Sequence, residues 1–398
     1  MFALRRKRWK MVKLSKIITQ VRGVSYKPND VILEKKAGYT CLLRANNIDR
    51  GELKFDDVVY VDSARVKNTQ LLRAEDILIC ASSGSRHLVG KAACVIGDMN
   101  VTFGAFCKVI RPLAEYAPFL GWFFKSPRYR MQISNASAGV NINNIRAEDI
   151  DNMEIDLLTV KQREEAVRKL NAITHLISLR QRQAEKLDEL VKARFVEMFG
   201  DPVLNCQGFP VRTIGELTTE VKYGTSKPAV EGGKYPYLRM NNLTIDGKLD
   251  LHDLKQIDVD TSEFEKCVVR KGDVLFNRTN SAELVGKTAY YGLDEEMIIA
   301  GYIIRVRVNN LILPQYLSFY MNMPFMKQRI RSMAKGAVNQ ANINSKELKS
   351  IKVIVPPLEV QGKVVEYEER IDREKDRIQR SAALLETLKR SLMQQYFG

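Results

Sequence analysis

Cysteine and histidine, the residues that build structural metal sites and disulfide frameworks, are scarce in this sequence. It contains six cysteines and three histidines among 398 residues, and no two cysteines are spaced as Cys-x-x-Cys. Zinc ligands usually come in such close pairs, and small secreted scaffolds pair their cysteines. We therefore expect no metal site, no disulfide framework, and free thiols in a reducing cytoplasm.

Long apolar stretches are also missing. No uninterrupted apolar run is long enough to span a bilayer, so no membrane association is expected. The basic start, "MFALRRKRWKMVKL", lacks the apolar run of a secretory signal behind it. A mitochondrial-type presequence is the alternative, although the basic run leads directly into patterned sequence.

A complete nucleotide-binding loop is absent. "LVGKT" (284–288) ends like a phosphate-binding loop, but the glycine that should open the motif is Ser281. "LVGK" also occurs at 88–91, where Ala92 follows in place of the hydroxyl residue. We therefore interpret both as turns between strands, with Gly90 and Gly286 supplying backbone freedom.

Catalytic motifs are not evident, and we predict no catalytic residue and no cofactor. No Gly-x-Gly loop follows a strand to hold an adenosyl cofactor. "NMPF" (322–325) resembles the loop with which amino-methyltransferases hold a flipped adenine. The equivalent segment "KSPRY" (125–129) keeps only the proline, which favours a helix-breaking turn in both places.

Positive charge is abundant. The chain has 63 lysines and arginines against 47 acidic residues, a formal net charge of +16. Such an excess favours a polyanionic partner, most simply a nucleic acid. An acidic partner subunit is the alternative.

The chain also contains an internal repeat, shifted by about 200 residues. Both copies begin with short β-branched and aromatic runs separated by Gly, Asn and Asp turns, which predicts two similar β-rich domains. The matched segments are 9–17 with 209–217, 39–55 with 235–251, 72–95 with 269–291, 119–133 with 317–330, and 139–150 with 337–348.

Each copy ends in a long helical pattern whose seam residues, mostly apolar with some polar ones among them, recur at alternating spacings of three and four. These heptad seams predict two helices that pair antiparallel as a coiled coil. Two helices that each pack on their own domain are the alternative. We expect an α+β fold with a first domain at 1–158, a helix at 159–204, a second domain at 205–357 and a second helix at 358–398.

This order of segments resembles the specificity subunit of type I restriction-modification systems, on the "WKMVKLSKI" opening (9–17) and the repeated "EDIL" or "GDVL" strands followed by "GK". The resemblance implies a pseudo-twofold repeat of two target recognition domains, each reading half of a bipartite double-stranded DNA site. It also implies helices that set the spacing and dock methyltransferase subunits, two of them by expectation. Restriction subunits with nuclease and translocase activity are further partners in such systems.

Polar loop residues are the candidates for reading DNA, because Arg suits guanine, Asn and Gln suit adenine, and Ser and Thr accept several bases. Ordinary turn chemistry is the alternative for all of them. Two loops supply most candidates in each copy, 82–87 and 141–144 in the first and 277–281 and 339–342 in the second. A third motif, Arg-x-Asn-Asn, is the same in both copies and therefore fits a structural or phosphate-positioning role better than base reading. The candidates are Ser82, Ser83, Ser85, Arg86, His87, Lys91, Asn141, Asn143 and Asn144 in the first copy, then Asn277, Arg278, Thr279, Asn280, Ser281, Lys287, Asn339, Gln340 and Asn342 in the second, with Arg44 and Arg239 from the third motif.

Two other functional classes stay open. One is a catalytic protein, either a methyltransferase or a nucleotide-dependent enzyme. The other is a basic scaffold that meets acidic partner subunits without reading DNA.

Overall fold

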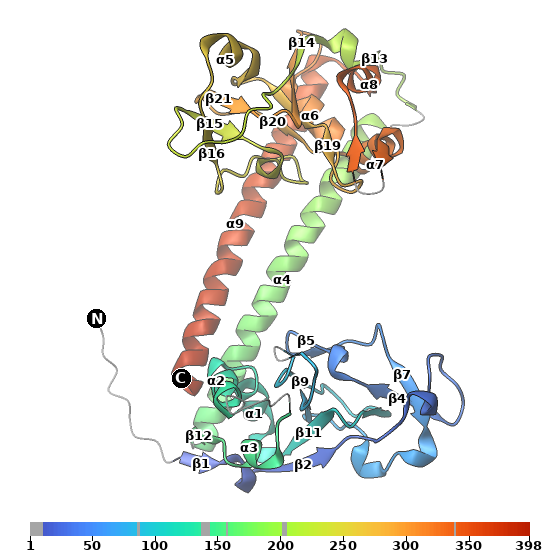
Figure 1. The fold of residues 1–398 in the computed structure, drawn as a ribbon, viewed down its shortest axis with the longest axis vertical. Coiled ribbons are helices and arrows are strands. Elements are labelled where there is room, and N and C mark those ends of the chain that lie inside the picture. Colours follow the sequence, from blue (N-terminus) through green and yellow to red (C-terminus); the bar gives the residue numbers. More distant parts are fainter. Residues whose placement is uncertain (1–10, 86–87, 137–143, 157, 201–204, 338–339) are drawn as a thin grey trace. The chain divides into compact units, whose positions relative to one another are not determined.

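The computed structural model describes residues 11–85, 88–136, 144–156, 158–200, 205–337 and 340–398. The chain divides into two compact units (Figure 1). Unit 1 comprises residues 1–180 together with 380–398, and unit 2 comprises residues 181–379. Both units mix sheets and helices, so the α+β prediction is confirmed.

Unit 1 is built on two four-stranded sheets. The first has the strand order β2-β11-β8-β9 with antiparallel neighbours, and the second has the order β10-β4-β7-β3. A short pair, β1 with β12, brings the start of the unit beside the strand that precedes the long helix. The bounds are β1 (Met11–Lys13), β2 (Ile18–Arg22), β3 (Val31–Ile32), β4 (Tyr39–Leu43), β5 (Ile48–Asp49), β6 (Glu52–Leu53), β7 (Val59–Asp62), β8 (Ile77–Cys80), β9 (Ala92–Cys94), β10 (Val101–Phe103), β11 (Cys107–Pro112) and β12 (Glu154–Asp156).

Unit 2 repeats this plan. Its sheets have the orders β14-β22-β18-β20 and β16-β15-β21-β17, and β13 pairs with β25 as β1 does with β12. The bounds are β13 (Val211–Thr213), β14 (Thr218–Tyr223), β15 (Tyr235–Leu238), β16 (Lys255–Ile257), β17 (Val268–Val269), β18 (Val274–Asn277), β19 (Thr279–Asn280), β20 (Thr288–Tyr290), β21 (Met297–Ile299), β22 (Ile303–Val308), β23 (Lys335–Ala337), β24 (Gln340–Asn342) and β25 (Lys352–Ile354).

One unusual detail confirms that the copies share a fold. In the second sheet of unit 1, β10 runs parallel to β4, while β7 pairs antiparallel with β4. In unit 2, β21 runs parallel to β15, while β16 pairs antiparallel with β15. The same mixture of directions arises in both copies of the repeat.

Prolines separate the short helices, as expected from the sequence. Pro127 begins one helix of unit 1 and Pro324 begins the equivalent helix of unit 2, because proline fits the first turn, where its missing N–H leaves no intrahelical bond broken. The short helices are α1 (Ala117–Phe123), α2 (Pro127–Ala136), α3 (Ala147–Asp151), α5 (Thr261–Cys267), α6 (Pro314–Asn322), α7 (Pro324–Met333) and α8 (Ser345–Ser350).

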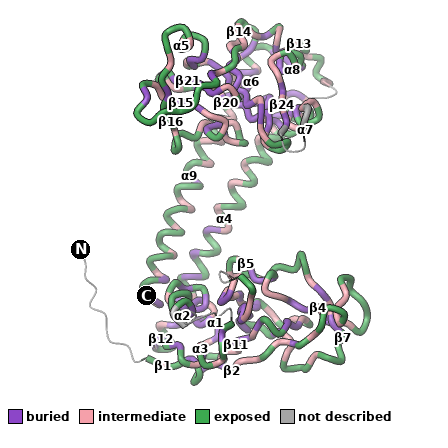
Figure 2. The backbone as a smooth tube through the Cα atoms, viewed as in Figure 1, coloured by how far each residue is buried: buried purple, intermediate pink, exposed green. Residues whose placement is uncertain are grey.

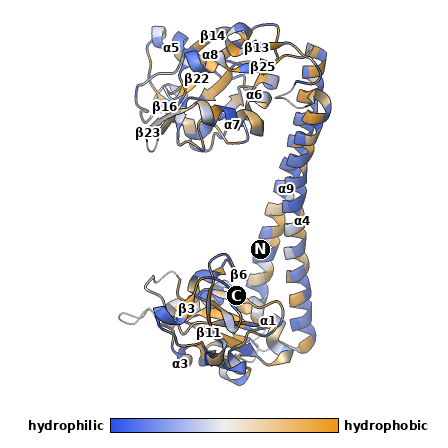
Figure 3. Ribbon diagram, turned by 90° about the vertical axis from the view of Figure 1, so that its right-hand side faces the viewer, coloured by the Kyte–Doolittle hydropathy of each residue, from blue (hydrophilic) through white to orange (hydrophobic). Residues whose placement is uncertain are grey.

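The two long helices, α4 (Val160–Phe199) and α9 (Leu358–Phe397), contribute to both units. In unit 1, Arg180 Nε donates to Ser381 Oγ at 3.2 Å. In unit 2, Lys375 forms an ion pair with Asp188, and the Arg194 guanidinium lies over the Tyr367 ring. Residue numbers rise along α4 as they fall along α9, so the predicted antiparallel pairing is present within each unit. Both helices carry a mixture of hydrophilic and hydrophobic residues (Figure 3).

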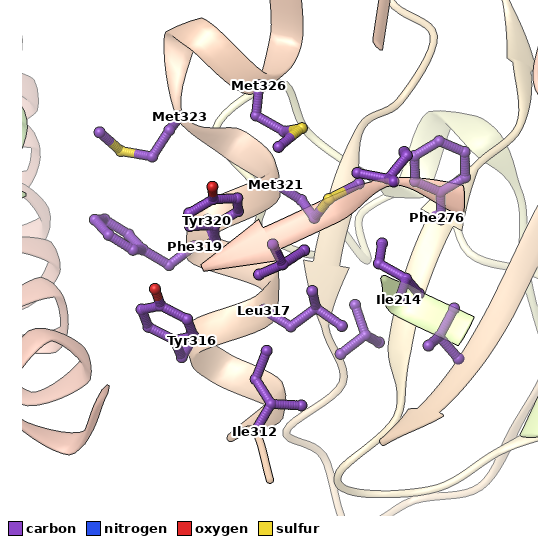
Figure 4. Close-up of a cluster of buried hydrophobic side chains, with 14 of the residues drawn as sticks. Ile214, Phe276, Ile312, Tyr316, Leu317, Phe319, Tyr320, Met321, Met323 and Met326 are labelled. Atoms are coloured by element: carbon purple, nitrogen blue, oxygen red, sulfur yellow. The ribbon is translucent and has the colours of Figure 1, made fainter. Parts of the chain in front are cut away.

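Buried residues concentrate in the sheets and short helices, whereas much of α4 and α9 is exposed (Figure 2). In unit 2, α6 directs Leu317 and Met321 toward the sheet, near Ile214 and Phe276 (Figure 4). Its aromatic residues lie on the other side of the helix and pack against Phe195 and Phe199 of α4, namely Tyr316, Phe319 and Tyr320. In unit 1, Phe119 and Phe123 from α1 pack against Phe397 at the end of α9, with ring centroids 4.8 and 6.3 Å apart. The core of unit 1 therefore includes the last turn of α9. None of the described helices is both long and apolar enough to cross a membrane.

Candidate nucleic-acid interface

Two of the predicted loops meet in unit 1. Ser82, after the central strand β8, forms an antiparallel bridge with Asn144, which precedes α3. Beside it, the Ile145 N–H donates to the Ala81 carbonyl at 2.7 Å. The N–H groups of Ala81 and Ser82 both donate to the Phe106 carbonyl at 2.9 Å. Backbone hydrogen bonds to two other segments thus hold the loop in place.

Unit 2 repeats most of this arrangement. Thr279 pairs with Asn342 in the β19–β24 ladder, and the Thr279 hydroxyl donates to the Asn342 side-chain oxygen at 2.8 Å. The Ile343 N–H donates to the Arg278 carbonyl, and the Arg278 N–H donates to the Tyr302 carbonyl, each at 2.9 Å. We call this set of backbone contacts, around residues 81–82 in unit 1 and 278–279 in unit 2, the backbone frame. The same frame therefore carries different side chains in the two units.

Several predicted side chains lie on the surface of this frame. In unit 1, Ser85 and Asn144 are exposed, while Ser82, Ser83 and Lys91 are half-buried. In unit 2, Ser281 is exposed and Asn280 is half-buried, with its amide donating to Asn277 Oδ1 at 3.0 Å. The half-buried Arg278 holds its guanidinium 4.9 Å above the Tyr223 ring. Arg86, His87, Asn141, Asn143 and Asn339 lie outside the described residues, and Gln340 is described only as part of β24.

Three side chains that we predicted to contact DNA are instead buried inside unit 2. Asn277 is fully buried, and its amide donates to the carbonyls of Thr279 and Tyr302, each at 3.1 Å. Thr279 is buried beside Asn342. Lys287 is only 7% exposed, and its ammonium donates to the Met240 carbonyl at 2.6 Å. Burial lowers the pKa of Lys287, and its side chain holds the unit together rather than facing a ligand.

The two glycine-lysine turns are strand connections, as predicted. Gly90 and Gly286 have φ of 77° and 82°, a region that favours glycine. In each turn a basic side chain from the following short helix reaches the backbone. Arg130 Nη1 donates to the Val89 carbonyl at 3.2 Å, and Lys327 Nζ donates to the Gly286 carbonyl at 2.6 Å.

The third motif, Arg-x-Asn-Asn, makes the same internal contacts in both units. The side chains of Asn47 and Asn242 are buried, and each accepts the backbone N–H of the preceding arginine at 2.8 Å. The arginines form ion pairs, Arg44 with Asp57 at 3.0 Å and Arg239 with Asp253 at 2.7 Å. These contacts give the motif a structural role in the described residues.

The segment that resembles an adenine-binding loop is also used internally. The Asn322 amide donates to the carbonyls of Thr288 and Ser318, at 2.6 and 2.9 Å. Phe325 packs against Tyr320 and Phe195, with centroids 5.3 and 5.9 Å apart. Neither side chain is placed to hold a base. Within the described part of the chain, no group of three or more His, Cys, Asp or Glu side chains is placed to hold a metal ion.

Two exposed aromatic residues next to the frame, Phe106 and Tyr302, are absent from the predicted set. Both lie in a glycine-containing turn, in "FGAFCKV" (103–109) and "AGYIIRV" (300–306), and the repeat aligns them. That alignment was the available signal, but sequence alone does not show whether an aromatic residue is buried.

Comparison with known proteins places this architecture among subunits that recognise DNA for restriction enzymes. Residues 208–389 match the family described as type I restriction modification DNA specificity domain. The EcoKI specificity subunit of Escherichia coli K12 is 29% identical over 389 residues, which cover 94% of this chain and 84% of that protein. The StySPI specificity subunit of Salmonella potsdam is 27% identical over 388 residues, with the same coverage.

Solved structures show the same fold. A chain from work on complex assembly and conformational transition of the type I R-M system aligns with a TM-score of 0.63 at 19% identity, covering 98% of this chain and 97% of that one. The type I S subunit of M. genitalium aligns with a TM-score of 0.57 at 15% identity, covering 100% and 98%. Over residues 208–389 the chain matches this family, and over most of its length it is similar to specificity subunits of type I restriction-modification systems.

Proposed function

We propose that each unit reads one half of a bipartite double-stranded DNA target, and that the chain supplies recognition without catalysing a reaction itself. The observation that carries this proposal is the repeated backbone frame with different polar side chains. Two readers of different half-sites need the same scaffold and unlike contact residues, because base edges are distinguished by their pattern of donors and acceptors.

Exposed and half-buried polar residues of the frame are the proposed base contacts. Ser83, Ser85 and Asn144 serve unit 1, and Arg278, Asn280 and Ser281 serve unit 2. Arg278 would have to leave its position over Tyr223 to reach a guanine edge. The net charge of +16 supports attraction to the phosphate backbone, which contributes affinity without sequence preference.

We propose that the long helices dock two methyltransferase subunits and, where the cell has them, restriction subunits. Large apolar side chains are exposed on both helices within unit 1, namely Leu176 and Leu179 on α4 and Leu384 and Leu388 on α9. Exposed apolar groups on paired helices favour a protein partner. Since its proposed substrate is the cell's DNA, we place the protein in the cytoplasm.

Methylome mapping tests the function. Cells that carry the gene should show a split methylated motif that disappears when the gene is deleted. Exchanging residues 72–95 for the equivalent loop set of a distant homologue should change one half of that motif only. A change in both halves, or no split motif in any strain, would contradict independent half-site reading.

Two measurements separate the alternatives. The purified chain alone, given DNA and an adenosyl methyl donor, should transfer no methyl groups, and clear turnover would favour a catalytic protein. Binding to random duplex should weaken steeply as salt rises, because phosphate contacts release counterions. Binding that is independent of salt would favour the basic scaffold.

The role of α4 as a spacer has its own test. Four residues inserted before Val191 would lengthen the helix by about 6 Å and rotate the following residues by about 40°. At roughly 3.4 Å per base pair, the gap between the half-sites should grow by one or two base pairs, with both half-sites unchanged. An unchanged gap in an active variant would show that the partner subunits set the spacing.

A further inference from the structure

Phe106 and Tyr302 occupy the same position in the two units. Each is the third residue of a β-turn that joins two strands, β10 to β11 in unit 1 and β21 to β22 in unit 2. The turns are closed by the Cys107 N–H donating to the Gly104 carbonyl and the Ile303 N–H donating to the Ala300 carbonyl, both at 2.8 Å. Phe106 is 65% exposed and Tyr302 is 50% exposed.

The turns are held firmly on one side by close backbone contact. In unit 1, the Val24 N–H donates to the Phe103 carbonyl at 2.7 Å, and a Cβ added at Gly23 would lie 2.1 Å from the Gly104 carbonyl oxygen. In unit 2, the Thr225 N–H donates to the Ile299 carbonyl at 2.9 Å, and a Cβ at Gly224 would lie 2.1 Å from that same oxygen. Only glycine allows this approach.

On the other side, the backbone of each aromatic residue is hydrogen-bonded to the loop that we propose reads bases. We call these the reading loops, 81–85 in unit 1 and 277–281 in unit 2. The Phe106 carbonyl accepts the N–H groups of Ala81 and Ser82, and the Tyr302 carbonyl accepts the Arg278 N–H and the Asn277 amide. Each ring therefore projects from a rigid turn directly beside the residues that we assign to base reading.

A single exposed aromatic residue is common on protein surfaces and requires no explanation. Here the same exposed feature recurs in two domains whose neighbouring residues differ, Ala105 against Gly301 and Cys107 against Ile303. Solvent-exposed rings add little to folding stability, so stability does not explain the recurrence. The surroundings are polar and basic, with Lys108 donating to the Ile145 carbonyl in unit 1 and Arg278 beside Tyr302 in unit 2. A surface of this kind fits duplex DNA better than an apolar protein partner.

We propose that Phe106 and Tyr302 are apolar wedges that insert at one base step of their half-site and pack against the exposed base faces. This inference rests on the proposed function. Apolar side chains at protein–DNA interfaces can enter partly unstacked steps, and enzymes that modify a base must remove it from the stack. A ring on a rigid turn is suited to occupy the opened step, because little conformational freedom is lost on insertion.

The test uses the complex of this chain with its methyltransferase subunits and the split motif found by methylome mapping. Fluorescence anisotropy would measure the affinity for the intact site and for sites that carry one abasic position, scanned along each half. We expect Phe106→Ala and Tyr302→Ala each to weaken binding to the intact site by about tenfold or more. An abasic position at one step of the corresponding half-site should restore most of that loss, because the opening no longer has to be stabilised.

Matched variants control for folding and for general surface effects. Ile96→Ala removes a side chain that is 94% exposed and lies at the opposite end of the β8–β9 hairpin from the reading loop, so binding should not change. Tyr302→Phe keeps the ring and should bind like the wild type. Urea unfolding midpoints should be unchanged. If Phe106→Ala lowers the urea midpoint, Phe106→Leu, which keeps an apolar side chain, is used in its place. Phe106→Leu should lose less affinity for the intact site, and the abasic site should again restore that affinity.

Three different results would contradict, in turn, the contact with DNA, the insertion between bases and the proposed function itself. Alanine variants that bind the intact site like the wild type would exclude a contact. Equal losses on intact and abasic sites would indicate an edge contact and exclude insertion. A wild-type complex that shows no preference for the split motif over random duplex would instead refute the proposed function.

Discussion

Asp76 holds Arg111 with two hydrogen bonds, Nε to Oδ1 at 2.8 Å and Nη2 to Oδ2 at 2.7 Å. The carboxylate also accepts the Arg73 N–H at 2.9 Å, so it closes the turn before β8 and anchors a side chain of β11. In unit 2, Asp273 repeats this, accepting Arg307 Nε and the Arg270 N–H at 2.8 Å. This double role explains the aspartate in the repeated "EDIL" and "GDVL" strands.

Replacing Asp76 by Asn should destabilise unit 1. Asp76 is 1% exposed and Arg111 is 18% exposed, and removing one partner of a buried pair typically costs about 3–5 kcal/mol. The Asp76 carboxylate also raises the pKa of Arg111, as expected when it stabilises the charged guanidinium. Urea denaturation should show a lower midpoint. Adding Arg111→Met should recover part of the loss, since it removes the unpaired charge. A double variant less stable than Asp76→Asn would contradict this.

Replacing Gly90 by Ala should cost more than replacing Gly38 by Ala. Both glycines have positive φ, 77° and 81°, so alanine is strained at either position. At Gly90 an added Cβ would also lie 2.7 Å from Ile133 Cγ2, whereas at Gly38 nothing lies within 4 Å. Overpacking of this kind costs about 1–3 kcal/mol. Thermal unfolding of the two variants measures the difference, and equal losses would show that Ile133 moves away freely.

Lys327 should make the stability of unit 2 depend on pH. Burial, with Arg331 and Lys287 nearby, lowers the pKa of Lys327 to about 7 from 10.5. Between these values the unfolded chain binds a proton that the folded chain does not, so the contribution of Lys327 to stability is complete above about 10.5 and lost as pH falls through about 7. The free energy of unfolding of the wild type, relative to Lys327→Met, should therefore rise between pH 6 and pH 9.5. A difference that stays constant would contradict the shifted pKa.

Glu368 should act in the opposite direction. Burial, with Asp372 beside it, raises the pKa of Glu368 to about 8 from 4.5, although Lys248 and Lys375 oppose the shift. The folded state then holds the proton more tightly than the unfolded chain does. The contribution of Glu368 to stability is therefore complete below about pH 4.5 and lost as pH rises through about 8. Glu368→Gln, which mimics the neutral acid, should gain stability over the wild type between pH 5 and pH 8.5. Glu369→Gln, at an exposed neighbouring position, is the control, and an equal gain there would exclude a specific effect.

Local patterns in the sequence predicted much of this fold. The heptad seams predicted helices close to the observed bounds of α4 and α9, because an amphipathic stripe is a property of a continuous segment. The internal repeat predicted two similar domains, and the prolines at 127 and 324 predicted breaks between short helices.

Contacts between distant segments were not predictable in the same way. The sequence alone does not show that Ser82 pairs with Asn144 or that Asp76 forms an ion pair with Arg111, because the order of the strands in the sheet decides both. Burial was the second difficulty. Lys287 is a charged residue in a glycine turn, which favours exposure, but the Met240 carbonyl accepts its ammonium inside the unit. Phe106 shows the reverse, an aromatic residue left in solvent by a turn.

The packing of Phe397 against Phe119 and Phe123 has a consequence for biosynthesis. Domains usually fold as they leave the ribosome, the N-terminal one first. The core of unit 1, however, includes Met393 and Phe397, which are translated only after the whole of unit 2. The first domain to emerge therefore waits for the whole of unit 2 before its core can close. During that interval its apolar surface is available to chaperones and proteases, so the cellular level of this protein should depend on how quickly unit 2 is translated.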